Sequence, residues 1–164
     1  GAEVIAGDTI ILYGLSLDIP LATARTFTTM TLISMVVGYI IGIITIPRFI
    51  SQGKALAVAA VLGFVFALLA IFTSGYTSIA CIALLGLSNA VMWPAIFPLA
   101  IADLGRFTKA GSALLIMGIA GGAILPLLYG KLVAVTGNQQ AYWMLIPIYI
   151  FIFYFAMFGN KIRK

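Results

Sequence analysis

The sequence predicts an all-α, polytopic membrane protein in which about six helices cross a lipid bilayer. Of its 164 residues, 63% are apolar and 8% are charged, whereas soluble globular domains are roughly 45–50% apolar and about 25% charged. The segments 26–47, 55–102, 110–130 and 132–160 contain no Asp, Glu, Lys or Arg. Because a helix needs roughly 20 apolar residues to cross a hydrocarbon core of about 30 Å, each segment is long enough for at least one crossing.

The expected crossings follow one another along the chain with short connections. We place them at residues 1–16, 26–47, 55–73, 78–102, 110–132 and 142–160. The longest charge-free stretch divides into the third and fourth crossings at a turn around Gly75. Tyr142 and Trp143 open the last crossing, where amphipathic rings favour the level of the lipid headgroups. The alternating segments of roughly 10 residues that are typical of membrane barrels are absent from the sequence, which favours helices.

Basic residues predict the orientation of the bundle. One connection holds Arg48 and Lys54, another holds Arg106 and Lys109, and residues 161–164 form a basic tail. Two predicted crossings separate each of these segments from the next, so all of them lie at the same end of the bundle. Cytoplasmic loops of membrane proteins carry an excess of Lys and Arg. We therefore expect this end, including the C-terminus, to face the cytoplasm.

Two acidic residues, Glu3 and Asp8, lie in the first predicted crossing. A carboxylate in the middle of a bilayer costs about 2.5–3.5 kcal/mol, so it normally faces a cavity or a partner. Positions five apart on a helix are about 140° apart around its axis, so at most one of the two is expected to face a transport pathway. There a carboxylate could accept hydrogen bonds from sugar hydroxyls or, if desolvated, take up a proton. The alternative is that they are simply solvated, Glu3 near the cytoplasmic boundary.

The fourth crossing contains the other candidate site residues. Asn89 and Trp93 are four positions apart and share one face of the helix. An amide beside a large flat ring suits the hydroxyl edge and the C–H face of a sugar. Pro94 and Pro98 follow directly, and each removes a backbone N–H, so we expect the helix to break there and line a cavity. The alternative is a kinked packing helix in which Asn89 bonds to a neighbouring side chain.

Small residues in two further crossings predict close helix packing. Gly38 and Gly42 are four apart, as are Gly118 and Gly122, and this spacing lets membrane helices approach closely. The fifth crossing also contains Pro126, which makes it a second candidate for bending.

Several classes of function are excluded or disfavoured by what the sequence lacks. Histidine is absent, and no cluster of metal ligands is visible, so no metal site is predicted. Neither a phosphate-binding Gly-rich loop ending in Lys and Ser/Thr nor a set of catalytic nucleophile and base occurs, so the protein is not predicted to be an enzyme or to hold a cofactor. The basic residues mark topology and do not form a surface for nucleic acid. The single cysteine, Cys81, excludes an intrachain disulfide and is expected to be a buried thiol.

These residues resemble a known family of transporters. The stretch 1–9, which contains Glu3 and Asp8, resembles the start of the seventh helix of fucose/galactose/glucose:proton symporters of the major facilitator superfamily. Residues 86–97 resemble their tenth helix and residues 111–126 their eleventh. Residues 47–54, with Arg48 and Lys54, are similar to a degenerate form of the superfamily's loop motif that lacks its usual Asp, which disfavours a gating role for this loop.

The resemblance implies that residues 1–164 are the C-terminal six-helix half of a sugar transporter, made of two inverted three-helix repeats. It implies proton-coupled import of a hexose such as glucose, galactose or fucose by alternating access, in a bacterial inner membrane. The N-terminal half of the same protein would be missing from this chain, and with it the family's principal proton-binding acids. Glu3 and Asp8 are then expected to bind sugar or couple helices. An exporter of drugs or metabolites from the same superfamily, a channel and a non-transporting scaffold remain alternatives.

Overall fold

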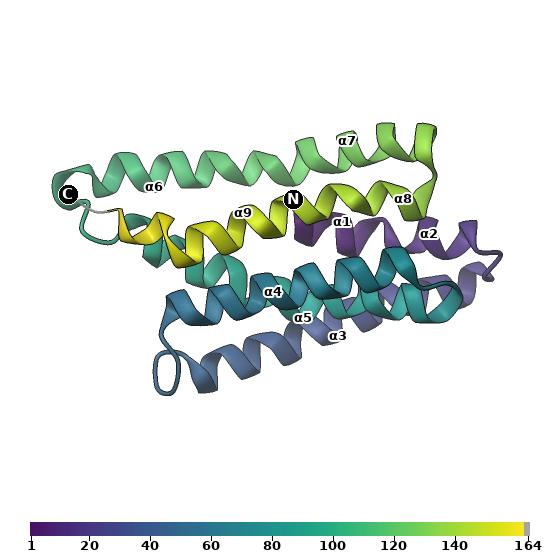
Figure 1. Ribbon diagram of the computed structural model, residues 1–164, viewed down its shortest axis with the longest axis horizontal. Helices are drawn as coiled ribbons and strands as arrows, with labels where there is room; N and C mark the ends of the chain where they lie inside the picture. Colours follow the sequence, from purple (N-terminus) through teal and green to yellow (C-terminus); the bar gives the residue numbers. More distant parts are fainter. Residues whose placement is uncertain (163–164) are drawn as a thin grey trace.

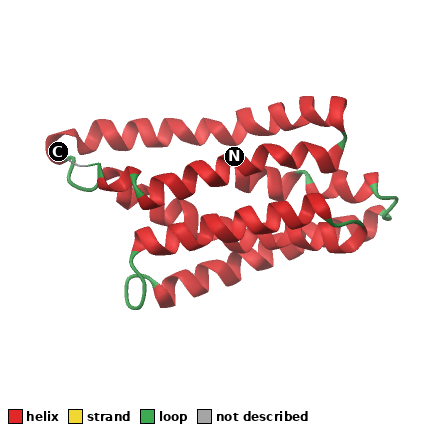
Figure 2. Cartoon of the chain, viewed as in Figure 1, coloured by secondary structure: helices red, strands yellow, loops and turns green. Residues whose placement is uncertain are grey.

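The computed structural model describes residues 1–162, and within this range it consists of helices joined by turns, without strands (Figures 1 and 2). The helices run roughly along the long axis of the molecule (Figure 1). Their bounds are α1 Ala2–Asp8, α2 Ile10–Ser16, α3 Leu21–Thr45, α4 Gln52–Phe72, α5 Gly75–Ile101, η1 Gly105–Phe107, α6 Thr108–Met117, η2 Gly118–Ala120, α7 Gly121–Thr136, α8 Asn138–Ala141, η3 Tyr142–Met144, α9 Leu145–Met157 and η4 Gly159–Lys161.

The predicted membrane class is confirmed by the lengths of these helices. Five helical stretches of the described chain are long and apolar enough to cross a membrane: Leu21–Thr45, Gln52–Phe72, Gly75–Ile101, Gly105–Thr136 and Asn138–Lys161. Together with the shorter segment formed by α1 and α2, these five stretches give about six helical segments that run side by side. The bounds of each of the five long stretches agree with those of one predicted crossing to within a few residues.

The first predicted crossing differs from the expectation, because it spans only part of the bundle. The N-terminus lies about midway along the long axis, and α1 and α2 run from there to one end (Figure 1). Fifteen helical residues extend only about 22 Å, which is shorter than a hydrocarbon core. Glu3, close to this N-terminus, therefore lies between the two ends of the bundle (Figure 1), which disfavours the alternative that it sits at the cytoplasmic boundary.

The irregular positions of the helices also differ from the prediction. Helix α5 continues through Pro94 and Pro98 without interruption, so the expected break there is wrong. Each proline still lacks an N–H, but α5 packs along both α3 and α4, which hold it helical. One interruption lies in the fifth predicted crossing, the second candidate for bending, and another lies in the first. The 3-10 turn η2 separates α6 from α7 at Gly118, and Thr9 separates α1 from α2, with its hydroxyl donating to the carbonyl of Ile5 over 2.6 Å.

Glycines let α5 pack closely against α3, as the small-residue spacing predicted. A Cβ on Gly38 would lie 2.6 Å from the carbonyl oxygen of Leu87 and 2.8 Å from the Cβ of Ala90, and a Cβ on Gly86 would collide with the carbonyl oxygen of Thr31. Around Gly118, in contrast, no described atom lies within 4 Å of the added Cβ. The close packing predicted for this pair is therefore not seen at Gly118, whereas a Cβ on Gly122 would lie 3.4 Å from Cγ2 of Val4 on α1, an ordinary contact distance.

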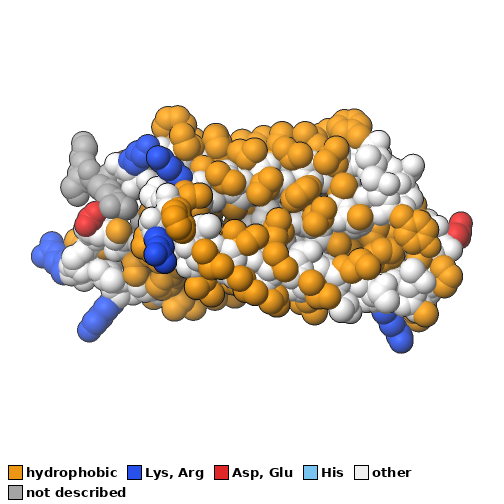
Figure 3. Space-filling model, turned by 90° about the horizontal axis from the view of Figure 1, so that it is seen from below, with side chains coloured by type: hydrophobic (Ala, Val, Ile, Leu, Met, Phe, Trp, Pro, Cys, Tyr) orange, Lys and Arg blue, Asp and Glu red, His pale blue; other side chains and the backbone are white. Residues whose placement is uncertain are grey.

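Charged side chains gather at the two ends of an apolar body. In Figure 3, hydrophobic side chains cover the middle of the visible face, and most of the basic side chains seen lie toward one end. The α3–α4 connection, the α5–α6 connection and the C-terminal end of the described chain all lie at that end (Figure 1). The predicted grouping of basic segments is therefore confirmed, although Arg163 and Lys164 of the expected tail lie outside the described residues. Cys81 is a buried free thiol, as predicted.

Candidate sugar-binding pocket

A pocket of about 170 Å³ lies where α1, α5, α7 and α9 meet. Glu3 comes to it from α1, and Asn89 and Trp93 come to it from α5. The structure thus brings three of the four predicted site residues together. The remaining wall is largely apolar and includes Met92, Ile96, Leu125, Ile148 and Ile152.

Asn89 contributes the most constrained polar group of this pocket. Its side chain is 3% exposed, and its Oδ1 accepts a hydrogen bond from the Tyr149 hydroxyl over 3.0 Å. Its Nδ2 is buried and has no hydrogen-bond partner within the described residues. A buried polar group without a partner costs about 1–3 kcal/mol, which makes this amide a candidate donor for a ligand.

Trp93 lies one helical turn further along α5 and presents a flat apolar surface. Its side chain is 40% exposed, and its ring centroid lies 5.8 Å from that of Phe97 in a tilted arrangement. The indole is therefore supported by a second ring while part of it stays accessible. An aromatic face of this kind packs against C–H groups of a ligand whose polar edge is satisfied by Asn89.

The two acidic residues of α1 differ in their relation to the pocket. Both are exposed, but only Glu3 lines the pocket, while Asp8 lies outside its lining. Of the two, only Glu3 therefore shares the pocket with Asn89 and Trp93. Helix α1 is held in place by Ile5 and Ala6, which are completely buried.

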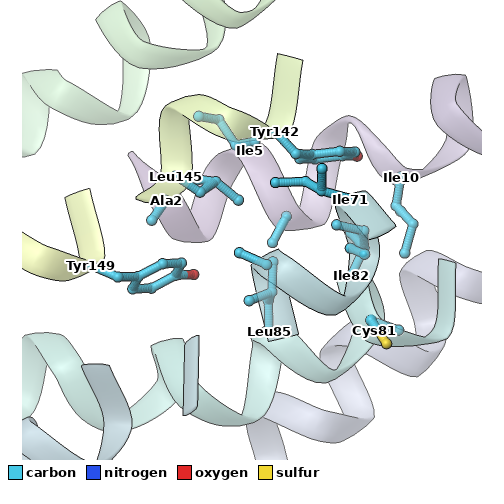
Figure 4. Close-up of a cluster of buried hydrophobic side chains, with 14 of the residues drawn as sticks. Ala2, Ile5, Ile10, Ile71, Cys81, Ile82, Leu85, Tyr142, Leu145 and Tyr149 are labelled. Atoms are coloured by element: carbon cyan, nitrogen blue, oxygen red, sulfur yellow. The ribbon is translucent and has the colours of Figure 1, made fainter. Parts of the chain in front are cut away.

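Tyr149 is the site residue that the sequence did not reveal. It extends from α9 into the core (Figure 4), where it is completely buried. A lone tyrosine in an apolar crossing resembles many packing residues, and its partner Asn89 is 60 positions away in the sequence. The nearest signal was the position of a hydroxyl-bearing ring in the middle of a predicted crossing.

A second polar cluster ties the non-basic ends of the helices together. Thr9 and Tyr142 share a hydrogen bond of 2.9 Å, and Tyr13 and Ser78 share one of 2.6 Å. The ring centroids of Tyr13 and Tyr142 lie 5.4 Å apart in an edge-on arrangement. Because Tyr142 is completely buried, its predicted role as an interfacial anchor is wrong: its hydroxyl is satisfied within the protein. Trp143, next to it, is 42% exposed.

Curated relatives of this chain are named as sugar transporters. A glucose/galactose transporter of Brucella abortus is 37% identical over 114 residues, which are 70% of this chain and 28% of the relative. A putative glucose/galactose transporter of Helicobacter pylori is 32% identical, over 76% of this chain and 32% of the relative. An L-fucose-proton symporter of Escherichia coli is 31% identical, over 98% of this chain and 37% of the relative. The chain thus spans about a third of the length of these relatives. No protein-family model matches the sequence.

The fold is similar to part of a solved transporter. The crystal structure of FucP, described as a major facilitator superfamily transporter in the outward conformation, superimposes with a TM-score of 0.85 at 26% sequence identity. The match covers 96% of this chain and 39% of the FucP chain. The helices described above therefore have the arrangement found in one part of such a transporter.

Proposed function

We propose that this chain, which belongs to the major facilitator superfamily, is the C-terminal half of a proton-coupled hexose importer. The observation that carries the proposal is the convergence of Asn89, Trp93 and Glu3 on one pocket at the meeting point of α1, α5, α7 and α9. An unpartnered amide donor, an accessible indole and a carboxylate acceptor together match the mixed polar and apolar surface of a sugar. Glucose, galactose and fucose are the substrates to test first, because the relatives are named for them.

The size of the pocket supports a site completed by a second half of the same protein. Its volume of about 170 Å³ is smaller than the roughly 300–1,000 Å³ of usual small-molecule sites. The matched relatives are also about three to four times as long as the matched segment. In the proposed transporter, residues 1–164 form one wall of the sugar site and an N-terminal half forms the other. Rocking of the two halves about the sugar then gives alternating access.

The proton gradient is the proposed driving force, with no further cofactor. Glu3 is placed to accept a hydrogen bond from a sugar hydroxyl, since it shares the pocket with Asn89. Asp8, outside the lining, is assigned a role in coupling helix movements. The main proton-binding groups belong to the proposed N-terminal half. The protein is proposed to lie in a bacterial inner membrane with its basic end, and hence its C-terminus, in the cytoplasm.

The test is sugar accumulation by the complete protein that contains this chain, reconstituted into proteoliposomes. An inward proton gradient should drive uptake of labelled glucose, galactose or fucose above its outside concentration, and a protonophore should reduce the level to equilibrium. Accumulation that survives collapse of the gradient would rule out proton coupling. Competition by amphipathic cations in place of sugars would identify an exporter of the same superfamily, and unsaturable flux would identify a channel.

A further inference from the structure

We propose that Tyr149 is a positioning residue: it orients the amide of Asn89 so that the site offers the sugar a hydrogen-bond donor at this point. This inference rests on the proposed function and deepens it, because it specifies what chemical group the substrate must present. The observation behind it is that one end of the Asn89 amide has a hydrogen-bond partner and the other has none. Its Oδ1 accepts from the Tyr149 hydroxyl over 3.0 Å, while its Nδ2 is buried and unpartnered within the described residues.

The ring of Tyr149 is closely packed and has little freedom to move. It packs on Gly63 of α4, where an added Cβ would lie 2.8 Å from both Cδ1 and Cζ of the ring. Tyr149 is completely buried between α4 and α5. Because contacts of this kind hold the ring at close-packed density, its hydroxyl stays at one place beside α5. Gly63 therefore helps to fix the position of Tyr149, since only a residue without a side chain leaves room for the ring.

In the structure the Tyr149 hydroxyl donates to Oδ1, and this hydrogen bond holds one of the two orientations of the amide. A carboxamide can present either its oxygen or its NH₂ group, and both ends are similar in size. With Oδ1 satisfied by the phenolic O–H of Tyr149, the NH₂ group is the end that remains to bind a ligand in the pocket that Asn89 lines. The matching group on the substrate is an acceptor, which on a hexose is a hydroxyl oxygen or the ring oxygen.

Deoxy and deoxyfluoro sugars distinguish the two orientations. A C–F group accepts a hydrogen bond weakly and cannot donate one, whereas a C–H group does neither. In the complete wild-type transporter, binding should show one ring position at which the deoxy sugar is about 5- to 20-fold weaker than the parent sugar and the fluoro sugar is less affected. In Tyr149→Phe the amide is released, and the fluoro sugar should lose its advantage over the deoxy sugar at that position to within about twofold.

Two further variants keep the test independent of the folding of one mutant. Tyr154→Phe is the matched control, because Tyr154 lies on the same helix α9, is 52% exposed and should retain the wild-type pattern. Asn89→Asp replaces the donor by an acceptor, so it should weaken binding of the fluoro sugar more than that of the parent sugar, whose hydroxyl can still donate.

The outcomes separate this inference from the proposed function. A wild-type protein that binds no hexose overturns both. Hexose binding with no position at which fluorine is tolerated better than hydrogen overturns the donor orientation. A Tyr149→Phe protein that keeps the wild-type ratio of fluoro to deoxy affinities overturns the positioning role and leaves the proposed function standing. Loss of that ratio in Tyr149→Phe, with the ratio kept in Tyr154→Phe, supports it.

Discussion

The Gln139→Ala substitution probes how α8 secures the end of α4. The side-chain amide of Gln139 lies 2.9 Å from the carbonyl oxygen of Ala70, 3.1 Å from that of Ile71 and 2.6 Å from that of Thr73. The last carbonyls of a helix have no partner within the helix itself. Gln139 therefore acts as a cap supplied by a helix that is distant in sequence.

The magnitude follows from the number of hydrogens available. The amide nitrogen has two hydrogens and three acceptors, so it makes about two good hydrogen bonds at a time. Each such bond contributes about 0.5–1.5 kcal/mol to stability. Gln139→Ala should therefore lower the free energy of unfolding by about 1–3 kcal/mol.

Gln140→Ala is the matched control for this prediction. Gln140 is the next residue of the same short helix, is exposed, and accepts a hydrogen bond from the indole of Trp143 over 3.0 Å at the surface. Its replacement should cost less than about 0.5 kcal/mol, as is usual for surface positions. Denaturant unfolding of the purified protein in detergent, followed by the loss of helical circular dichroism, measures both. Equal losses for the two variants would refute the interpretation of Gln139 as a cap.

Three further substitutions test separate parts of the structure. Gly86→Ala should destabilise the protein by about 1–3 kcal/mol through overpacking, whereas Gly130→Ala, with open space around its Cβ among the described residues, should be neutral or stabilising in the same unfolding assay; similar losses at both positions would contradict the close packing of α3 and α5. Tyr142→Phe should cost about 0.5–1.5 kcal/mol, since it removes a buried hydrogen bond, and an unchanged unfolding midpoint would contradict this. Glu3→Gln should weaken hexose binding about tenfold and Asp8→Asn less than about twofold, because only Glu3 lines the pocket. Isothermal titration calorimetry measures both affinities, and a larger loss for Asp8→Asn than for Glu3→Gln would contradict this.

The architecture was predictable because the bilayer imposes strong limits on composition. Charge-free segments mark helices that must satisfy their own backbone in lipid, and the expected crossing 26–47 corresponds to Leu21–Thr45. The grouping of basic segments at one end was predictable for the same reason. The continuity of α5 through its prolines was not, since it depends on the packing of α3 and α4 along it.

The sequence predicted Glu3, Asn89 and Trp93 as site residues, but only the shared face of Asn89 and Trp93 followed from local geometry. Asn89 and Trp93 are one turn apart on α5, so helical geometry places them on one face whatever surrounds them. Tyr149 approaches from α9, and its hydrogen bond to Asn89 joins residues 60 positions apart. No local pattern encodes that contact. Likewise, Tyr142 has the sequence context of an interfacial residue, but the cluster with Thr9 that buries it forms only in the folded bundle.

Equilibrium binding of a labelled hexose to the complete purified protein tests the central claim most directly, because it requires no assumption about coupling. Wild-type protein should bind glucose, galactose or fucose saturably. Asn89→Ala and Trp93→Ala should each weaken that binding by about tenfold or more, and Trp93→Ala should do so with little change in protein yield or unfolding midpoint. Hexose binding that is unaffected by both substitutions would contradict the assignment of this pocket as the sugar site.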